Sequence, residues 1–347
     1  MKGKQMKKSV LFLTIILALS LCFIGCGKST TDPGQPAANG DDEKLVIKYS
    51  SVDVEDSAIG IGMLAFKDYV EEASDGKITV EMYFGGQLGG DRENLENVLL
   101  NTVQFTVSDA GVMGGYNPSF YVLSMPYIFT DKESYYEALD GELGDALKEE
   151  ALESGFKLLG FGDAGSRHIA NSKREIRTPD DVKGLKIRVP ESEINIAFIE
   201  ALGASPTPIN FSETYTSLQQ KVVDGLENPI ELLYTSKFME VQQYLTLTSH
   251  IETPLVLVTS KEFFDGLSDE YKKIIEEGAK AQQEANRKAL AESEAIYYQK
   301  MLDEGKTITE LTEEEMQLFR DALRPVYEKF KPRAGEDIVA IAEKYQK

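Results

Sequence analysis

A helical pattern of more than thirty residues near the C-terminus constrains the fold of this chain more than any other feature. Residues 270–305 contain no proline and are nearly free of glycine. Since an α-helix rises about 1.5 Å per residue, a helix of this length extends beyond a single small lobe. We therefore predict one long helix at 270–305 that serves more than one compact part of the protein.

Upstream of this helix, segments with strand periodicity alternate with segments with helical periodicity. Strands are predicted at 45–49, 77–83, 103–107, 156–161 and 255–259, and helices at 58–73, 91–100, 192–202 and 212–223, with closing helices at 313–330 and 336–345. Such alternation is typical of α/β folds. The chain has 347 residues, of which 42% are hydrophobic, and this is enough for two lobes with their own cores.

The N-terminus has the pattern of an export signal. Four lysines precede an uncharged apolar run at 10–24, which is shorter than the roughly 20 residues of a membrane span. The run ends in Gly25-Cys26, and a small residue before a cysteine resembles a lipoprotein cleavage site. We expect residues 1–25 to be a lipoprotein signal peptide, lipidated Cys26 to anchor the protein to the cell membrane, and 26–44 to be a flexible tether. An uncleaved anchor is the alternative.

The charge and the cysteine content limit the expected partners. The net charge is −21, and an acidic surface repels phosphate backbones, so nucleic acid is not an expected partner. A small anionic ligand is compatible with this charge, because a local arginine outweighs a distant field that solvent and salt screen. Both cysteines lie in the N-terminal region, so we expect no disulfide in the mature chain.

The strand predicted at 186–189 carries an arginine that could hold a carboxylate. Alternation places Lys186 and Arg188 together on its polar face, and Pro190 ends the strand. A planar guanidinium can bind a carboxylate through two parallel hydrogen bonds, which a lysine cannot do. Periodicity alone favours an exposed arginine on a polar sheet face.

The segment Asp224–Pro229 is predicted to be a turn that stops at Asn-Pro and restarts as a helix. A proline places the residue before it in extended geometry and suits the start of a helix. Asn228 would thus present its amide rigidly to a ligand. The alternative is that Asn228 is a plain helix cap.

Three further motifs accompany these two segments. They are Gly86-Gln87-Leu88-Gly89-Gly90-Asp91-Arg92, then Leu202–Pro208 with Phe211–Gln220, and then Lys237–Leu245 with Thr248-Ser249-His250. Together the motifs resemble the substrate-binding proteins of TRAP transporters, the DctP family, over nearly the whole chain after about residue 44. The resemblance implies an α/β, two-lobed, periplasmic-binding-protein-like fold with a long helix crossing both lobes. Lobe I would contain 45–165 and about 254–293, and lobe II 166–253 and about 294–347.

The resemblance also implies roles for four residues. Arg188 would clamp the ligand's carboxylate, Asn228 would help to hold it, and Arg167 would be a second arginine that approaches it. Phe211, before the cap-like Ser212, would form an apolar wall against the ligand. A core residue under the helix is the alternative interpretation of Phe211.

Specificity is expected from the first lobe. Ser51, Asp53, Asp91 and Asp109 lie at predicted strand ends or in the loops after them, where ligands bind in α/β folds. Asp109 stands where sugar-acid-binding members of the family place an acid. A carboxylate accepts hydrogen bonds from hydroxyls and repels a second carboxylate, so Asp109 in the pocket would favour a polyhydroxy monocarboxylate over a dicarboxylate. A solvated loop acid is the alternative.

The remaining motifs do not indicate catalysis. Gly85–Gly90 lacks the phosphate-loop pattern and is better interpreted as a turn with positive φ. With two histidines and no nucleophile motif, we expect no catalytic residue, cofactor or metal. We interpret the chain as a monomeric extracytoplasmic lipoprotein that captures a small organic acid for TRAP transporter membrane subunits. The alternatives are a ligand-sensing protein for a membrane receptor and, less favoured, an exported enzyme.

Overall fold

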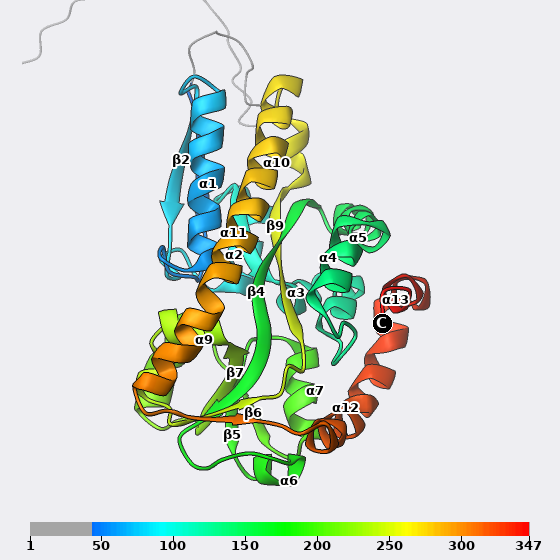
Figure 1. The fold of residues 1–347 in the computed structure, drawn as a ribbon. Coiled ribbons are helices and arrows are strands. Elements are labelled where there is room, and N and C mark those ends of the chain that lie inside the picture. Colours follow the sequence, from blue (N-terminus) through cyan, green and yellow to red (C-terminus); the bar gives the residue numbers. More distant parts are fainter. Residues whose placement is uncertain (1–43, 347) are drawn as a thin grey trace, which may run out of the picture. The chain divides into compact units, whose positions relative to one another are not determined.

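The computed structural model describes residues 44–346, and Figure 1 shows their arrangement. The expected signal peptide, Cys26 and the tether up to residue 43 lie outside the described residues. Within the described part of the chain, no helix combines the length and apolar character that crossing a membrane requires.

Ten strands and thirteen α-helices, with two short 3-10 helices, make up residues 44–346. The strands are β1 (Leu45–Ser50), β2 (Ile78–Tyr83), β3 (Phe105–Asp109), β4 (Phe156–Asn171), β5 (Lys186–Val189), β6 (Ser205–Pro208), β7 (Gly225–Pro229), β8 (Tyr244–Leu247), β9 (Glu252–Ser260) and β10 (Thr307–Glu310). The helices are α1 (Ala58–Ala73), α2 (Asp91–Leu99), α3 (Ala110–Met113), α4 (Lys132–Asp140), α5 (Glu142–Glu153), α6 (Pro179–Val182), α7 (Glu193–Ala201), α8 (Phe211–Gln219), α9 (Ile230–Thr235), α10 (Lys261–Asp265), α11 (Asp269–Asp303), α12 (Glu313–Ala334) and α13 (Glu336–Glu343), and the 3-10 helices are η1 (Pro118–Ser124) and η2 (Phe238–Glu240).

The strands form a mixed sheet with two parallel regions. Its order is β2-β1-β3-β9-β4-β7-β5-β6, and β8 joins β4 to β10. In the first half-sheet β1 lies parallel to β2 and β3, and in the second half-sheet β5 lies parallel to β6 and β7. The long strand β4 pairs with β9 beside the first half-sheet and with β7 and β8 in the second. Figure 1 shows β4 running from beside β9 to beside β7.

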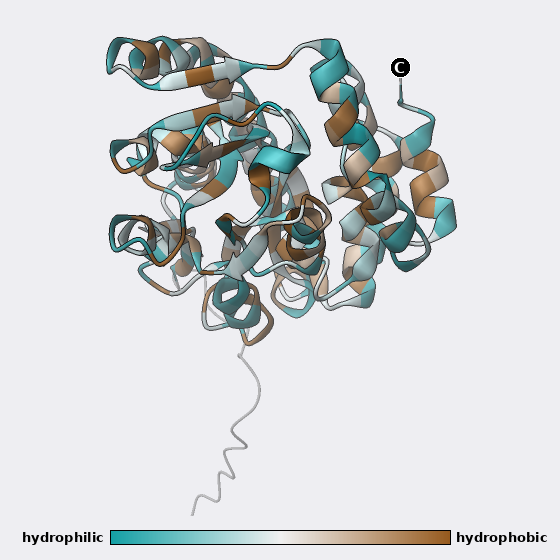
Figure 2. Cartoon of the chain, turned by 90° about the horizontal axis from the view of Figure 1, so that it is seen from below, coloured by the Kyte–Doolittle hydropathy of each residue, from teal (hydrophilic) through white to brown (hydrophobic). Residues whose placement is uncertain are grey.

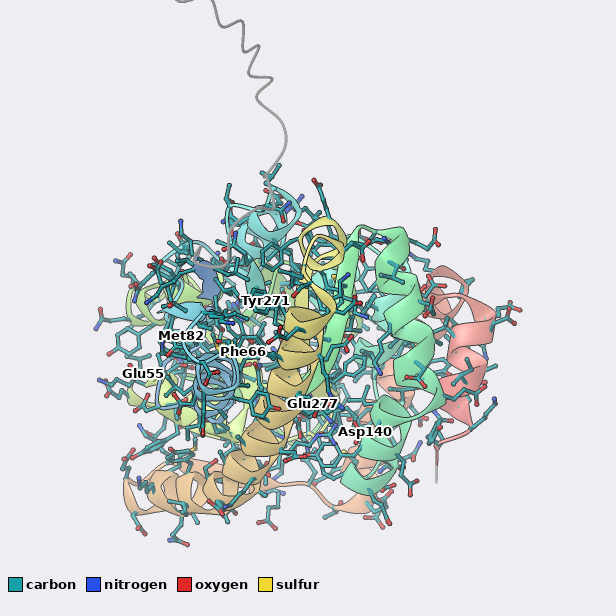
Figure 3. The ribbon with its side chains drawn as sticks, turned by 90° about the horizontal axis from the view of Figure 1, so that it is seen from above. Glu55, Phe66, Met82, Asp140, Tyr271 and Glu277 are labelled. Carbon is teal, nitrogen blue, oxygen red and sulfur yellow. The ribbon has the colours of Figure 1, made fainter. Side chains whose placement is uncertain are left out.

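The long helix α11 contributes to a core at each end. Near its start, Ile275 packs in a core with Phe66 of α1, which lies between the two helices in Figure 3. Near its end, Met301 packs in a second core with Leu226 of β7. The helix spans 35 residues and begins at the cap of Ser268. The prediction of one long helix serving two compact parts is therefore confirmed.

The C-terminal helix α12 shows why the closing helices are amphipathic. Its buried residues recur every three or four positions, namely Phe319, Leu323, Val326, Phe330 and Ala334. This spacing places them on one face, and Figure 2 shows hydrophobic and hydrophilic residues side by side along the helices near the C-terminus. Burial of that apolar face, rather than helix propensity alone, fixes α12 against η1 and α7.

The prediction of a turn at 224–229 is wrong, because residues 225–229 form strand β7. All five residues of β7 are buried between β4 and β5. The Asp-Gly and Asn-Pro pairs indicate turns. A strand that is buried on both faces shows no alternation of polar and apolar residues, so the sequence contained no strand pattern to outweigh these turn signals. Several other bounds differ as well; for example, β4 continues to Asn171, β9 begins at Glu252, α8 ends at Gln219 and α12 continues to Ala334.

Candidate ligand-binding site

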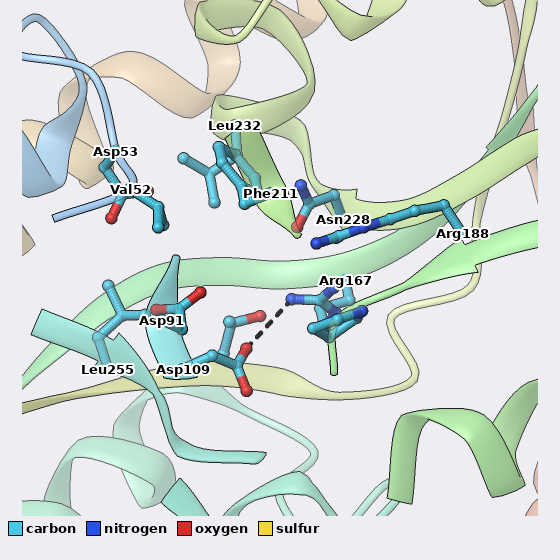
Figure 4. A pocket seen from close by; sticks show the side chains of 12 residues that line it. Val52, Asp53, Asp91, Asp109, Arg167, Arg188, Phe211, Asn228, Leu232 and Leu255 are labelled. Carbon is cyan, nitrogen blue, oxygen red and sulfur yellow. Dashed lines mark ion pairs between the residues drawn. The ribbon is translucent and has the colours of Figure 1, made fainter. Parts of the chain in front are cut away.

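A pocket lies where the two half-sheets meet, with an acidic wall and a basic wall (Figure 4). Its lining residues are Val52, Asp53, Asp91, Asp109, Arg167, Arg188, Pro190, Phe211, Asn228, Leu232, Thr253 and Leu255. Seven of the eight predicted site residues are among them. The eighth, Ser51, is buried behind the wall and donates a hydrogen bond to Asp53 Oδ2 at 2.8 Å.

Arg188, at the end of β5, is 2% exposed, whereas Lys186 of the same strand is exposed. Lys186 and Arg188 lie two positions apart on β5 and therefore share a face, but that face is buried at Arg188, so the alternative of an exposed arginine is wrong. The Nε atom of Arg188 donates to the carbonyl oxygen of Ile209 at 2.8 Å, and its guanidinium lies 5.7 Å from the ring centre of Phe211. Burial, followed by the charge of Arg167, lowers its pKa to about 10. Among the described residues it has no acidic partner within ion-pair distance, so neutral groups orient a cation that can receive an anion.

Arg167, on β4, has its charge balanced within the protein. Its Nη2 donates to Glu227 Oε1 and to the Glu227 carbonyl oxygen, both at 2.9 Å, and its Nε contacts Oε2. Its Nη1 lies 3.6 Å from Asp109 Oδ2, as the dashed line in Figure 4 marks. Although burial alone would lower the pKa of Arg167, Glu227 and Asp109 raise it. Arg167 is thus a fixed positive edge of the pocket.

Sequence reasoning missed Glu227, which pairs with Arg167 beside the pocket, and Thr253, which lines it. Glu227 is fully buried on β7, with His250 Nε2 at 3.4 Å and Asn195 Nδ2 at 3.5 Å. Burial by itself would raise the pKa of Glu227, but Arg167 and His250 lower it to about 2. If residues 225–229 had been interpreted as a buried strand, the acid at position 227 would have indicated a buried ion pair with an arginine.

Asn228 and Thr253 add neutral hydrogen-bonding groups to the basic side of the pocket. The Asn228 Nδ2 and Thr253 Oγ1 atoms are buried and have no hydrogen-bond partner among the described residues. Figure 4 shows Asn228 beside the Arg188 guanidinium. A buried donor without a partner costs free energy, so both atoms favour a polar ligand group in the pocket.

Three aspartates form the acidic wall, at the end of β3, in the loop after β1 and at the start of α2. Burial, with contributions from neighbouring carboxylates, raises the pKa of Asp53 to about 6 and that of Asp91 to about 7. Burial also raises the pKa of Asp109, although Arg167 opposes this, and Asp109 Oδ1 accepts from the Gly111 N–H at 2.7 Å. Asp109 therefore faces the pocket rather than solvent, and the wall offers acceptors to hydroxyl groups.

Phe211 is one of the apolar residues that line the pocket, together with Val52, Leu232 and Leu255, and Figure 4 shows it beside Leu232. Phe211 is the first residue of α8, and the cap is Asn210, so the predicted cap at Ser212 is wrong. Its ring meets that of Phe238 edge-on at 5.3 Å, which ties the pocket wall to the core of the second half-sheet. Phe211 thus combines the two interpretations, as wall and as packing residue.

The site suits binding rather than bond-breaking chemistry. Both histidines are buried with lowered pKa values, that of His168 to about 3, primarily because burial disfavours the charged form. In residues 44–346 no group of three or more His, Cys, Asp or Glu side chains could hold a metal ion. A two-part α/β fold with a buried arginine facing acids between its halves defines a solute-binding protein of the periplasmic type.

Comparison with known proteins gives the family. Residues 49–333 match the DctP model, described as bacterial extracellular solute-binding protein, family 7. The chain is 33% identical over 282 residues to the 2,3-diketo-L-gulonate-binding periplasmic protein YiaO of Escherichia coli, covering 80% of this chain and 85% of the relative. It is 35% identical over 304 residues to the C4-dicarboxylate-binding periplasmic protein DctP of Rhodobacter capsulatus, covering 87% and 91%.

A solved structure gives the same result. The TRAP periplasmic solute binding protein from Polaromonas sp. JS666, bound to D-erythronate, superposes with a TM-score of 0.83 at 32% identity, covering 86% of this chain and 98% of that one. The chain belongs to the DctP family of extracytoplasmic TRAP solute-binding proteins, which are binding proteins and not enzymes. The predicted family and the predicted α/β periplasmic-binding-protein fold are thus confirmed.

Proposed function

We propose that this protein captures a polyhydroxy monocarboxylate, such as an aldonate or uronate, and delivers it to TRAP transporter membrane subunits. The observation that carries the proposal is that Arg188, a buried cation with no acidic partner within ion-pair distance in residues 44–346, lies across the same pocket from three aspartates. One carboxylate on the ligand would neutralise Arg188. Hydroxyl groups would then donate to Asp53, Asp91 and Asp109.

A dicarboxylate fits this charge pattern less well. Arg167 is already paired with Glu227 and Asp109, so a second ligand carboxylate would meet the acidic wall without a free cation. The named relatives include a sugar-acid binder, a C4-dicarboxylate binder and a structure with D-erythronate, so the family accommodates both chemistries. The acidic wall of this chain favours the first.

Two further parts of the proposal concern anchoring and motion. Lipidated Cys26 would hold the protein at the outer face of the cell membrane, and 26–44 would act as its tether. The lobes would comprise 45–165 with about 254–293, and 166–253 with about 294–347. They would close on the ligand by bending where β4 and β9 pass between the half-sheets.

A thermal-shift screen followed by calorimetry tests the ligand class. The panel is D-galactonate, D-glucuronate, D-erythronate, succinate and L-malate, at neutral pH. A ligand at 100 times its dissociation constant stabilises the folded state by about 2.7 kcal/mol, which gives a measurable rise in Tm. We expect the sugar acids to bind at least tenfold more tightly than the dicarboxylates. Tight succinate or malate binding with no response to sugar acids would contradict the proposal.

A further inference from the structure

The backbone conformation of Gly90 does not require a glycine at this position. Gly90 precedes α2 with φ −78° and ψ −175°, a conformation that any residue adopts. A β-carbon at this position would nevertheless lie 1.6 Å from Nδ2 and 2.5 Å from Cγ of Asn210. A side chain at Gly90 would therefore require the side chain of Asn210, 120 positions later in the chain, to move.

Gly90 and Asn210 belong to opposite sides of the pocket. Gly90 leads directly into Asp91, on the acidic wall, and Asn210 leads into Phe211, beside Arg188. The contact is polar as well as close, since Glu93 Oε2 accepts from the Gly90 N–H at 3.0 Å and lies 3.4 Å from Asn210 Nδ2. The two walls thus meet at residues that directly precede the pocket-lining residues Asp91 and Phe211.

A second glycine repeats this arrangement behind the pocket. A β-carbon at Gly111, after β3, would lie 2.9 Å from Asp109 Oδ1 on its own side, and 2.9 Å from Ser192 Oγ and 3.0 Å from Asn195 Oδ1, which both lie at the start of α7 after β5. Gly111 has no positive φ. The Ser192 Oγ and Asn195 Oδ1 atoms are buried without a hydrogen-bond partner among the described residues, so the packing here is close without being a bonded network.

We propose that Gly90 and Gly111 are closure residues, at which the missing side chains allow the two halves of the pocket to meet over a bound ligand. The inference rests on the proposed function, because closure matters only in a protein that encloses its ligand. In this interpretation both glycines determine how fully the pocket shuts, while Arg188 and the aspartates determine what it encloses. A side chain at either position holds the two walls apart.

Gly90→Ala tests the inference, with Gly266→Ala as the matched control. Gly266 has an ordinary φ of −71°, and a β-carbon there would meet its nearest atoms, Glu262 O and Phe263 O, at 3.5 Å. Calorimetry with D-galactonate, D-glucuronate and succinate, on the full chain, should show at least tenfold weaker binding in Gly90→Ala and a change below twofold in Gly266→Ala. The unliganded Tm reports any local cost of alanine at the start of α2.

A double variant separates loss of closure from local damage. Asn210→Gly removes the group that the new β-carbon would meet, and glycine remains an acceptable cap for α8. We expect Gly90→Ala with Asn210→Gly to bind within threefold of Asn210→Gly alone. Equal affinity of Gly90→Ala and wild type, or a loss that Asn210→Gly does not restore, would overturn the inference. Failure of the wild type to bind any of the three acids would instead contradict the proposed function and remove the basis of this inference.

Discussion

Arg167 and Asp109 face each other across the pocket, with Nη1 and Oδ2 3.6 Å apart. Asp109 ends β3 in the first half-sheet, whereas Arg167 lies on β4 at the register position opposite Pro229 of β7. The ion pair therefore joins the two half-sheets at the ligand site. It also neutralises the charge of Arg167, so Arg188 is the cation that is oriented to bind a ligand carboxylate.

Arg188→Ala should weaken ligand binding by roughly 30-fold to a few thousandfold, since losing one partner of a buried charge pair costs about 2–5 kcal/mol. Arg188→Lys should also bind poorly, because a point charge does not reproduce two parallel hydrogen bonds. The unliganded fold should survive, because within residues 44–346 no acidic side chain is paired with Arg188, and its contacts with the Ile209 carbonyl oxygen and the Phe211 ring are the ones lost. Dissociation constants measured beside those of the exposed-arginine control Arg324→Ala check this. Native affinity in Arg188→Ala would mean that Arg167, and not Arg188, binds the ligand carboxylate.

Glu227→Gln should destabilise the unliganded fold by about 3 kcal/mol, because it leaves the buried Arg167 without its closest countercharge. Chemical denaturation measures the change. Glu96→Gln provides the control, since Glu96 pairs with Arg92 in solvent, where ion pairs contribute little. Equal effects of the two substitutions would show that the buried pair contributes no more than an exposed one.

The raised pKa values of Asp53 and Asp91 make stability depend on pH. A carboxyl whose folded pKa exceeds its unfolded value of 3.8 binds more protons in the folded state, so its contribution decreases as pH rises from about 4 to about 7. The lowered pKa of His168 acts in the opposite direction, adding stability as pH rises from about 3 to 6.5. The comparison with Asp91→Asn isolates the first effect.

We expect Asp91→Asn to gain unfolding free energy relative to wild type as pH rises from 4 to 7, by a few kcal/mol at most. Urea denaturation at pH 4, 5.5 and 7 without ligand measures the difference. A constant difference across this range would mean that Asp91 is not protonated preferentially in the folded protein. A difference of the opposite sign would mean that its folded pKa lies below 3.8.

Asp109→Asn should shift selectivity towards dicarboxylates. It removes an anion that repels a second ligand carboxylate, and it replaces a charged acceptor of hydroxyl hydrogen bonds with a weaker neutral one. We expect the ratio of the succinate Kd to the D-galactonate Kd to decrease at least tenfold. An unchanged ratio would place the specificity elsewhere on the wall, with Asp53 or Asp91.

Cys26 should be the first residue of the mature protein and carry lipid. Mass spectrometry of the membrane-extracted protein identifies the N-terminal residue and its modification. In Cys26→Ser the protein should leave the membrane fraction or keep its signal segment, whereas Cys22→Ser should be processed normally. A mature chain that begins elsewhere would contradict the anchoring proposal.

Local patterns predicted much of the secondary structure. The helix predicted at 58–73 has the bounds of α1, because Ser57 caps its start and Ser74-Asp75-Gly76 ends its periodicity. Residues 225–229 were mispredicted because a short strand is stabilised by its pairing with the strands on either side. No local signal specifies such neighbours.

Within the site, sequence reasoning found charged residues at strand ends but not their pairing. Strand alternation and the family resemblance pointed to Arg188, and the resemblance alone pointed to Arg167, but only the fold places Glu227 against Arg167. That assignment depends on the register of β4 with β7, in which Ile169 lies opposite Glu227. Pairing between strands some sixty residues apart is a long-range property that a single sequence does not reveal.

The passage of β4 and β9 between the two half-sheets affects how the chain can fold. Lys157 pairs with Thr259, about a hundred residues later, so the first half-sheet cannot be completed until most of the second has been synthesised. Neither half-sheet can therefore be completed by a continuous piece of the chain. Contacts this distant slow the search for the native state. The same strands that would permit closure also commit the protein to folding as one unit, so cutting the chain near residue 165 should yield two incomplete sheets instead of two separate domains.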